Sequence, residues 1–462
     1  MQQQELRDTL LYSPKNGYDV LSQEELAQMD AYCEGYKAFL NQGKTERECV
    51  RAAIAMAEKF GYRPWQAGET LQAGDKVYYN NRGRAIMLAH VGTESLNAGT
   101  TIVVAHTDAP ALHLKPTPLF EEDEMAFFKT HYYGGIIKYQ WLATPLVLHG
   151  EVVLKDGSHV TVSVGDGEDD PQFIITDLLP HLGKERGKQP LYEGVAGEKL
   201  HILVGSRPLS GDDGKNRVKV EVLRLLHDRY GITEEDLISA ELQAVPAAMA
   251  RDMGFDRSFI GAYGHDDRVC AYAGLAALTE LKAPKKTALC VFADKEEIGS
   301  EGVSGMQSAA FDYFLGDLCK ATGADFDTCC ANSFCLSADV TTAYDPNFAE
   351  VYDKHNACRV NYGLGLKKYT GHGGKSGASD ASAETVALVR NLLNKHHVLW
   401  QNSQSGKVDA GGGGTVAKYM AKRNIDTLDA GVPVLSMHAP CEVVSKLDCY
   451  MAYRAMKVLF EQ

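Results

Sequence analysis

Apolar runs and amphipathic stretches alternate along most of the chain and predict an α/β fold. Runs rich in apolar and β-branched residues, typical of strands buried on both faces, occur at residues 101–105, 287–293, 333–338 and 432–437. Stretches of helical character follow or separate these runs, at residues 268–281, 308–318, 379–394, 415–423 and 447–460. Strands that alternate with helices predict a mixed, largely parallel sheet covered by helices.

The part of the chain before the first of these strands is predicted to be helical and then extended. Two helices are predicted within residues 22–60, because Ser22 with Glu25 and Thr45 with Glu48 each match a capping box. Two short strands are predicted next, around an Asn-Arg-Gly turn, at residues 76–80 and 84–91.

A different pattern fills residues 116–245. Apolar and polar residues alternate there, and Asp-Gly turns at 156–157 and 166–167 separate the segments. This pattern is typical of antiparallel strands with one buried face. We therefore predict an inserted β-rich domain at 116–245, which divides the α/β domain into a first part, 1–115, and a second part, 246–462.

Composition and charge exclude several classes of partner. The chain has 462 residues, a net charge of −14 and a pI of about 5.6, so it lacks the basic face that nucleic-acid binding needs. The polar, acidic start of the chain is unlike a signal peptide, and no apolar run approaches the roughly 20 residues of a membrane helix. The 11 cysteines include no CxxC pair, which indicates buried free thiols. We expect a cytoplasmic protein.

Acidic residues and histidines follow the predicted buried strands at their carboxyl ends. The first strand ends in His106, with Asp108 two positions later. Comparable positions after the later strands, and at the start of the 268–281 helix, hold Asp294, Glu296, Glu297, Asp339, His438, Glu442, Asp266 and Asp267. One such residue alone would suit a helix cap or a solvated loop. Because sites in open α/β sheets lie beyond the carboxyl ends of the strands, we expect these side chains to converge.

Two histidines and three carboxylates would provide ligands for two divalent cations. Nitrogen and oxygen donors suit Zn²⁺, and also Co²⁺ or Mn²⁺, rather than Ca²⁺. Two ions roughly 3.5–4 Å apart need one bridging carboxylate. A glutamate beside them would act as general base on a shared water. Adjacent Glu296 and Glu297 can supply one ligand and one base, since neighbouring side chains leave an extended backbone in opposite directions. Asp108 is close enough to hold the second ring nitrogen of His106.

A glycine run at residues 411–414 opens the predicted helix at 415–423. It lacks the Gly-Lys-Ser/Thr ending of a phosphate-binding loop, so we expect no nucleotide site there. Its free backbone amides are instead suited to a substrate carboxylate.

Five motifs together resemble a known enzyme family. HTD, HDDR, DKEEIGSEG, SADVT and SMHAPCE, in this order, are similar to the dinuclear zinc aminopeptidases of the aspartyl aminopeptidase and vacuolar aminopeptidase I family. The resemblance covers nearly the whole chain, including the insertion. It implies a zinc-peptidase catalytic domain of the phosphorylase/hydrolase-like class with an inserted dimerisation domain. It also implies cleavage of the N-terminal residue from peptides with a free amino terminus.

The same resemblance implies a role for each residue of the motifs. Glu296 would be the general base, Asp108 would orient His106, and the peptide bond between Asp266 and Asp267 would be cis. The implied metal ligands are His106 and Asp339 for one zinc ion, Glu297 and His438 for the other, and Asp266 as the bridge.

Further expectations concern the substrate and the assembly. The resemblance implies that the glycine loop, with Gly413 and Gly414, lies near the substrate. It also implies a basic residue at the substrate side chain, which a rough alignment places at Lys375. Family members form tetrahedral dodecamers through the inserted domain, where a histidine, here His181, reaches a neighbouring subunit's site and helps to stabilise the transition state.

Two alternatives to this enzyme remain open on the sequence. One is a related dinuclear zinc enzyme, such as a glutamyl or leucyl aminopeptidase, a carboxypeptidase or a deacylase. The other is an oligomeric scaffold protein that has kept the fold without catalysis. The presence of Glu296 argues against a scaffold, because a base beside five ligands serves only catalysis.

Overall fold

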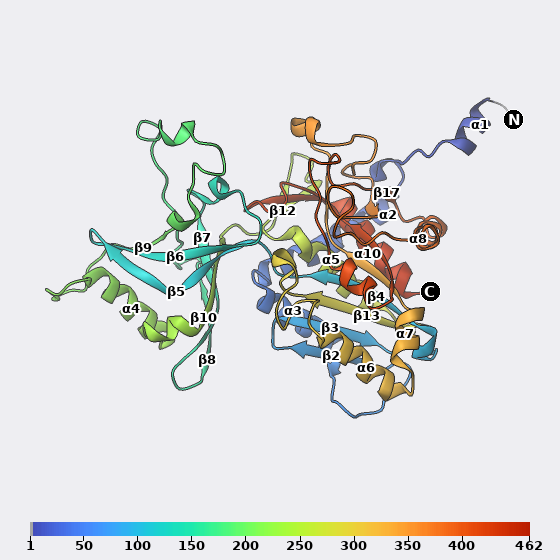
Figure 1. Ribbon diagram of the computed structural model, residues 1–462, viewed down its shortest axis with the longest axis horizontal. Helices are drawn as coiled ribbons and strands as arrows, with labels where there is room; N and C mark the ends of the chain where they lie inside the picture. The colour runs from blue at the N-terminus through green and yellow to red at the C-terminus, as the bar shows by residue number, and fades with distance from the viewer. Residues whose placement is uncertain (1–2) are drawn as a thin grey trace.

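The computed structural model describes residues 3–462 and contains a large mixed sheet, in the right-hand half of the molecule in Figure 1. Four neighbouring strands of this sheet run parallel, β13 Thr287–Ala293, β4 Thr100–His106, β14 Phe334–Ala338 and β18 Asp426–Gly431. The outer strands are β1 Arg63–Pro64, β2 Lys76–Asn81 and β3 Ala85–His90 on one side, and β16 Leu364–Lys367 and β17 Trp400–Asn402 on the other. The predicted α/β class is confirmed.

Helices cover both faces of the large sheet. One face carries α2 Gln23–Gln42, α3 Glu46–Lys59, α5 His265–Glu280, α8 Ala383–Lys395 and α10 Lys446–Phe460, and the other carries α6 Ala310–Thr322, α7 Phe326–Asn332 and α9 Ala417–Ala421. Successive residues of β4 belong to the two cores in turn: Val103 packs with the first group of helices and Val104 with the second. Burial on both faces explains why this strand has an unbroken apolar sequence.

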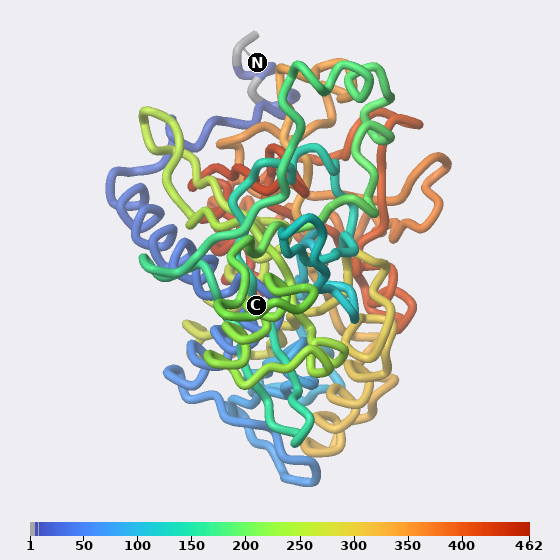
Figure 2. The backbone as a smooth tube through the Cα atoms, turned by 90° about the vertical axis from the view of Figure 1, so that its left-hand side faces the viewer, coloured from blue at the N-terminus to red at the C-terminus, as the bar shows by residue number. Residues whose placement is uncertain are grey.

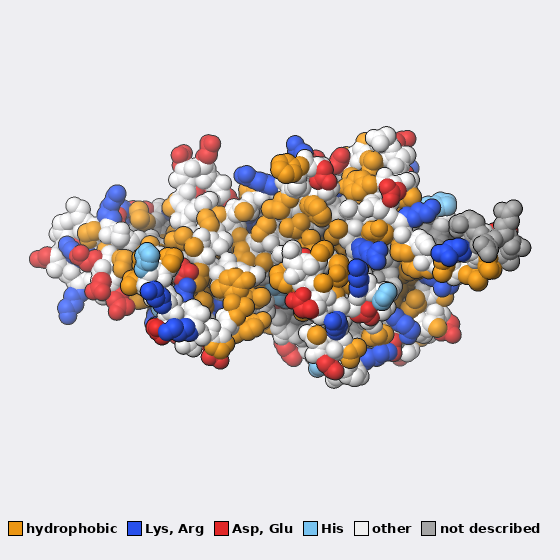
Figure 3. Space-filling model, turned by 90° about the horizontal axis from the view of Figure 1, so that it is seen from above, with side chains coloured by type: hydrophobic (Ala, Val, Ile, Leu, Met, Phe, Trp, Pro, Cys, Tyr) orange, Lys and Arg blue, Asp and Glu red, His pale blue; other side chains and the backbone are white. Residues whose placement is uncertain are grey.

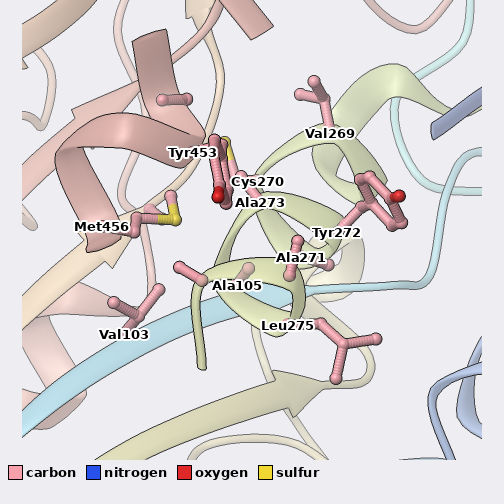
Figure 4. Packing of buried hydrophobic residues seen from close by; sticks show 14 of the residues in the cluster. Val103, Ala105, Val269, Cys270, Ala271, Tyr272, Ala273, Leu275, Tyr453 and Met456 are labelled. Atoms are coloured by element: carbon pink, nitrogen blue, oxygen red, sulfur yellow. The ribbon is translucent and has the colours of Figure 1, made fainter. Parts of the chain in front are cut away.

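Helix α5 lies close to the sheet because it is rich in small residues. A side chain at Gly274 would come within 3.1 Å of Cys290 on β13 and of Val103 on β4. Figure 4 shows side chains from β4 and α5 in one apolar cluster, together with Tyr453 and Met456 of α10. This packing fixes the amino terminus of α5 relative to the strand ends.

The predicted helices at the start of the chain are present. Helices α2 and α3 begin after Ser22 and Thr45, and both capping boxes are formed. A further helix, α1 Gln3–Leu10, lies apart from the main body (Figure 1). None of the helices in the described part of the chain combines the length and apolar character that a membrane crossing requires.

A second sheet forms the other half of the molecule. Its strands, all antiparallel, follow the order β8 His159–Val164, β7 Leu146–Val153, β10 Ala240–Pro246, β5 Ala111–Glu122, β6 Met125–Tyr133 and β9 Ile202–Gly205. Helix α4 Arg217–Tyr230 packs against it through Val218 and Val222. This β-rich half faces the viewer in Figure 2, with the α/β half behind it.

The strand predicted at residues 432–437 does not belong to the large sheet. Strand β19 Pro433–Leu435 lies in a smaller sheet with the order β11 Arg251–Met253, β12 Phe259–Ala262, β20 Glu442–Ser445, β19 and β15 Thr341–Thr342. In the large sheet, β14 pairs with β4 on one side and with β18, not β19, on the other. Strand β18 carries polar Thr427 and Asp429 among its buried residues, and these interrupt the apolar pattern.

An ionic cluster around buried His149 joins the two halves of the molecule. This residue lies on β7, and its Nδ1 atom is 2.8 Å from Glu48 of α3. Its Nε2 atom is 3.0 Å from Asp166, which also pairs with Lys44 at 2.9 Å. Burial lowers the pKa of His149, but the hydrogen bonds to Asp166 and Glu48 outweigh burial and raise it to about 9.

The cluster predicts a loss of stability at alkaline pH. A histidine with a raised pKa stabilises the fold fully below its unfolded pKa of about 6.5, and this contribution disappears as pH rises through about 9. We expect the thermal midpoint to fall as pH rises from about 6.5 to 9, and to fall less over this interval in His149→Gln. Exposed His159→Gln is the control and should behave like wild type. An equal fall in His149→Gln would contradict this role.

Candidate metal centre

The parallel strands bring the sequence-predicted residues to one edge of the sheet. His106 is the last residue of β4 and pairs in register with Ala293, the last residue of β13. Asp339 follows directly after β14, and Asp266 lies in the first turn of α5. His438 lies in the loop after β19. The convergence follows from the shared direction of the strands, which places their carboxyl ends together.

Asp266 lies between the two histidines. Its Oδ1 atom is 3.1 Å from Nε2 of His106, and its Oδ2 atom is 3.1 Å from Nε2 of His438. Glu297 approaches the same side, with its Oε1 atom 3.4 Å from Nε2 of His438. A single buried carboxylate therefore presents one oxygen to each imidazole.

The other nitrogen of each ring is held by a backbone carbonyl. Nδ1 of His106 lies 3.0 Å from the carbonyl oxygen of Asp108 and 3.3 Å from its Oδ1 atom. Nδ1 of His438 lies 2.8 Å from the carbonyl oxygen of Gly135. When Nδ1 carries the proton and donates it, a neutral ring presents the Nε2 lone pair to Asp266. Two lone pairs directed at one carboxylate are repelled by it unless a cation, or a proton on each ring, lies between them.

The surrounding carboxylates complete a donor set that fits metal ions. Buried oxygens of Asp266, Asp267 and Glu297 have no hydrogen-bond partner. Unpaired buried anions are costly, and a bound divalent cation would satisfy them. Three groups of side chains have donor atoms within 4.8 Å of one another, namely His106 with Glu296 and Asp339, His106 with Asp266 and Glu297, and Asp266 with Asp267 and Asp339. Nitrogen and oxygen donors of this kind suit zinc.

Crowded negative charge shifts the pKa values of the acidic groups. Burial, and then the charge of Asp339, raises the pKa of Glu296 to about 8. Burial likewise raises the pKa of Asp339 to about 6. For His438, burial lowers the pKa, but the hydrogen bond to Asp266 outweighs it and raises the pKa to about 10. Protons held by these side chains therefore reduce the repulsion between the carboxylates, and bound metal ions would take over this role.

Glu442 holds two parts of the site together, a role not predicted from the sequence. Its Oε2 atom accepts a hydrogen bond from the backbone N–H of Asp266 at 3.0 Å. Its Oε1 atom accepts one from the backbone N–H of His438 at 2.7 Å. The signal for this role is its position four residues after a candidate ligand. The peptide bond between Asp266 and Asp267 is cis, as the resemblance implies.

A cavity of about 490 Å³ opens over these residues. Asp266, Glu296, Glu297, Asp339 and His438 line one side of it, and two glycine-rich loops at 369–375 and 404–415 line the other. The backbone N–H of Gly371 donates to the carbonyl of Gly413 at 2.6 Å, which joins the two loops. The structure therefore places a substrate-sized space directly beside the carboxylate cluster.

The three residues that the sequence predicts to bind substrate all lie at the cavity. Lys375, Gly413 and Gly414 line the cavity, although Nζ of Lys375 also pairs with Asp380 at 3.0 Å. Lys367 lines the cavity too and was not predicted; it is buried and donates to the carbonyl of Val340 at 2.7 Å.

His181 is not among the residues that line this cavity in the described part of the chain. It lies in the exposed loop between β8 and β9.

The face of the molecule seen in Figure 3 carries acidic and basic side chains side by side, without one continuous basic area. All eleven cysteines are free thiols.

Relatives of known family match nearly the whole chain. The model of the family described as "Aminopeptidase I zinc metalloprotease (M18)" matches residues 39–460. A probable M18 family aminopeptidase 1 from Borreliella afzelii is 45% identical over 457 residues, covering 97% of this chain and 99% of the relative. A second one, from Clostridium acetobutylicum, is 45% identical over 450 residues, covering 96% and 97%.

Solved structures agree with this assignment. The crystal structure of an M18 aminopeptidase from Thermotoga maritima matches with a TM-score of 0.93 and 43% identity, covering 98% of this chain and all of the other. The dodecamer of mApe1 from S. cerevisiae shares the fold at 23% identity, with a TM-score of 0.77, covering 94% of this chain and 97% of the other. The chain belongs to the M18 family of aminopeptidase I zinc metalloproteases.

Proposed function

We propose that this M18 aminopeptidase binds two zinc ions at the strand ends, with Asp266 as the bridging ligand. His106 and Asp339 would hold one ion, and Glu297 and His438 the other. The observation that carries the proposal is the contact of one Asp266 oxygen with each imidazole, at 3.1 Å on both sides. Unpaired oxygens on Asp266 and Glu297 support it. Co²⁺ and Mn²⁺ suit the same donors.

Glu296 is the proposed general base for hydrolysis of the first peptide bond. Bound zinc ions would supply a water of lowered pKa and would polarise the peptide carbonyl. The carboxylate of Glu296 faces the cavity, accepts a proton from the attacking water and delivers it to the leaving amine. Burial and the charge of Asp339 raise the pKa of Glu296 in the metal-free site, and two bound cations would lower it again and leave a carboxylate that can accept the proton. Asp108 orients His106.

The proposed substrate is a peptide with a free amino terminus, bound in the cavity of about 490 Å³. Gly413 and Gly414 would offer backbone amides to a carboxylate of the substrate, and Lys375 would lie near its first side chain. We also propose the division of the chain into 1–115, 116–245 and 246–462, with the catalytic groups in the first and third parts.

The inserted domain is the proposed site of assembly into a homo-oligomer, a tetrahedral dodecamer. Its long loop between β8 and β9 exposes large apolar side chains by half or more of their surface, namely Leu178, Leu179, Leu182, Leu191 and Tyr192. Exposed apolar clusters of this kind mark protein interfaces. His181 lies within the same loop, and we propose that it completes a neighbouring subunit's site. The eleven free thiols support a cytoplasmic location.

Metal dependence and substrate polarity test this proposal. Zinc-replete protein is expected to release nitroaniline from aminoacyl-nitroanilides, to lose this activity completely with a chelator, and to recover it when zinc is added back. An N-acetylated aminoacyl-nitroanilide is the control and should remain intact. Cleavage of the acetylated compound, or of carboxyl-terminal residues alone, would instead indicate a deacylase or carboxypeptidase. No turnover of any of the twenty aminoacyl substrates would leave the scaffold alternative.

A further inference from the structure

A segment of the inserted domain reaches the candidate metal centre of the α/β half. Strand β6 ends at Tyr133, and Gly134 and Gly135 follow it. The hydroxyl of Tyr133 donates to Oδ2 of Asp108 at 2.7 Å. The carbonyl of Gly135 lies 2.8 Å from Nδ1 of His438. This segment, residues 133–135, therefore contacts groups on both sides of the proposed zinc pair.

The backbone of segment 133–135 packs directly against two proposed ligands. A Cβ atom at Gly134 would lie 3.3 Å from Cβ of Glu297 and 3.4 Å from its Oε2 atom, and the φ of +72° at this position favours glycine. A Cβ atom at Gly135 would lie 3.4 Å from Nδ1 of His438. A side chain would be strained at Gly134, whereas at Gly135 a Cβ atom would make an ordinary contact with His438.

The carboxylate of Asp108 connects Tyr133 to the turn that carries the base. Its two oxygens accept hydrogen bonds from the backbone N–H groups of Glu296 and Glu297, each at 3.2 Å. These residues begin the short helical turn η7 Glu296–Ile298. A shift of the Asp108 carboxylate would therefore move the proposed base and a proposed ligand together, and the hydroxyl of Tyr133 restrains that carboxylate.

The ring of Tyr133 is held independently of its hydroxyl. It stacks on the ring of His113, on the neighbouring strand β5, with centroids 4.6 Å apart and planes 9° from parallel. Phenylalanine at position 133 can keep this stacking, so the substitution removes one hydrogen bond and little else.

We propose that Tyr133 is a positioning residue for the aminopeptidase reaction, acting through Asp108 on Glu296 and Glu297. Segment 133–135 accordingly makes the inserted domain part of the catalytic centre of its own subunit, in addition to its proposed role in assembly. This inference rests on the proposed function. Partners that orient the ligands of a metal commonly change its affinity or the activity by about 10–100-fold when they are removed.

The test compares Tyr133→Phe with Tyr132→Phe, a neighbouring tyrosine that is 42% exposed. For Tyr133→Phe we expect kcat to fall about 10–100-fold with little change in KM, and zinc affinity to fall about 10-fold in competition with a chromophoric chelator. Tyr132→Phe should match wild type in both measurements. Wild-type kcat and zinc affinity in Tyr133→Phe would overturn the inference.

A double-mutant cycle with Asp108→Asn separates positioning from general packing. Asp108→Asn alone is expected to lower kcat and zinc affinity. If Tyr133 acts through Asp108, Tyr133→Phe should cost less than about 3-fold in the Asp108→Asn background, because coupled effects are not additive. Fully additive losses would overturn the proposed route.

A variant that restores a donor provides a rescue. 4-Aminophenylalanine at position 133 keeps an N–H donor at the end of the same ring, and we expect kcat within about 3-fold of wild type. Impairment equal to that of Tyr133→Phe would contradict a positioning hydrogen bond. The proposed function fails separately, if zinc-replete wild type hydrolyses no aminoacyl substrate.

Discussion

Glu296→Gln is expected to keep its zinc and lose turnover. Glutamine retains the shape of the side chain but cannot accept a proton from water, so kcat should fall about 10²–10⁴-fold, the range typical of general acid–base catalysis. Zinc content is measured on the purified protein by atomic absorption, and kcat with the best aminoacyl-nitroanilide. Because KM reflects binding of the peptide rather than proton transfer, it should change little.

The neighbouring glutamates provide the comparison for this result. Glu301→Gln, an exposed residue on the same loop, should behave like wild type. Glu297→Gln should lose zinc as well as activity, because its Oε1 atom is within 3.4 Å of His438 and is otherwise unpaired. Loss of zinc from Glu296→Gln, with retention by Glu297→Gln, would show that the two roles are exchanged.

Asp266→Asn is expected to remove most of the zinc and all measurable activity. Asp266 contacts both imidazoles, one with each oxygen. Asparagine keeps one oxygen, replaces the other by an NH₂ donor and loses the negative charge, so it cannot bridge two cations. We expect less than one zinc ion per chain and activity at the level of the chelated wild type, measured by metal analysis and nitroaniline release.

Asp156→Asn is the control for Asp266→Asn, since Asp156 lies in an exposed turn of the inserted domain. It should retain wild-type zinc content and turnover. Circular dichroism should show that Asp266→Asn remains folded, because the strands and α5 are stabilised by the apolar core rather than by this carboxylate. Two bound zinc ions in folded Asp266→Asn would contradict the bridging role.

Local sequence signals were sufficient for the elements that depend on few contacts. The capping boxes at Ser22 and Thr45 place the starts of α2 and α3 because a cap involves residues only three apart. Strands β13 and β4 were predicted because both faces are buried, which requires an unbroken apolar run. Strand β18 was missed, since its buried Asp429 pairs with Thr415 at 2.6 Å, a contact between residues 14 positions apart.

The residues of the candidate site also fall into two groups, those with a local sequence signal and those without one. His106, Asp339 and His438 stand out because each follows an apolar run, and the sheet rule then predicts that they meet. Lys367 and Tyr133 lack such a signal, and Glu442 follows the same apolar run as His438 without its role being predicted. Each makes a contact with a distant part of the chain, such as the bond from Tyr133 to Asp108 at 2.7 Å or the bond that Glu442 accepts from the backbone N–H of Asp266.

The amino-acid sequence by itself therefore determined the α/β class and the family, and it predicted the insertion and the chemical identity of the proposed ligands. These depend on residue types and their order, which are properties of the chain alone. Only the tertiary structure decided which oxygen of Asp266 faces which histidine, and that segment 133–135 of the insertion contacts the same centre. Those contacts depend on how strands distant in sequence pack together, a three-dimensional relation that no local pattern encodes.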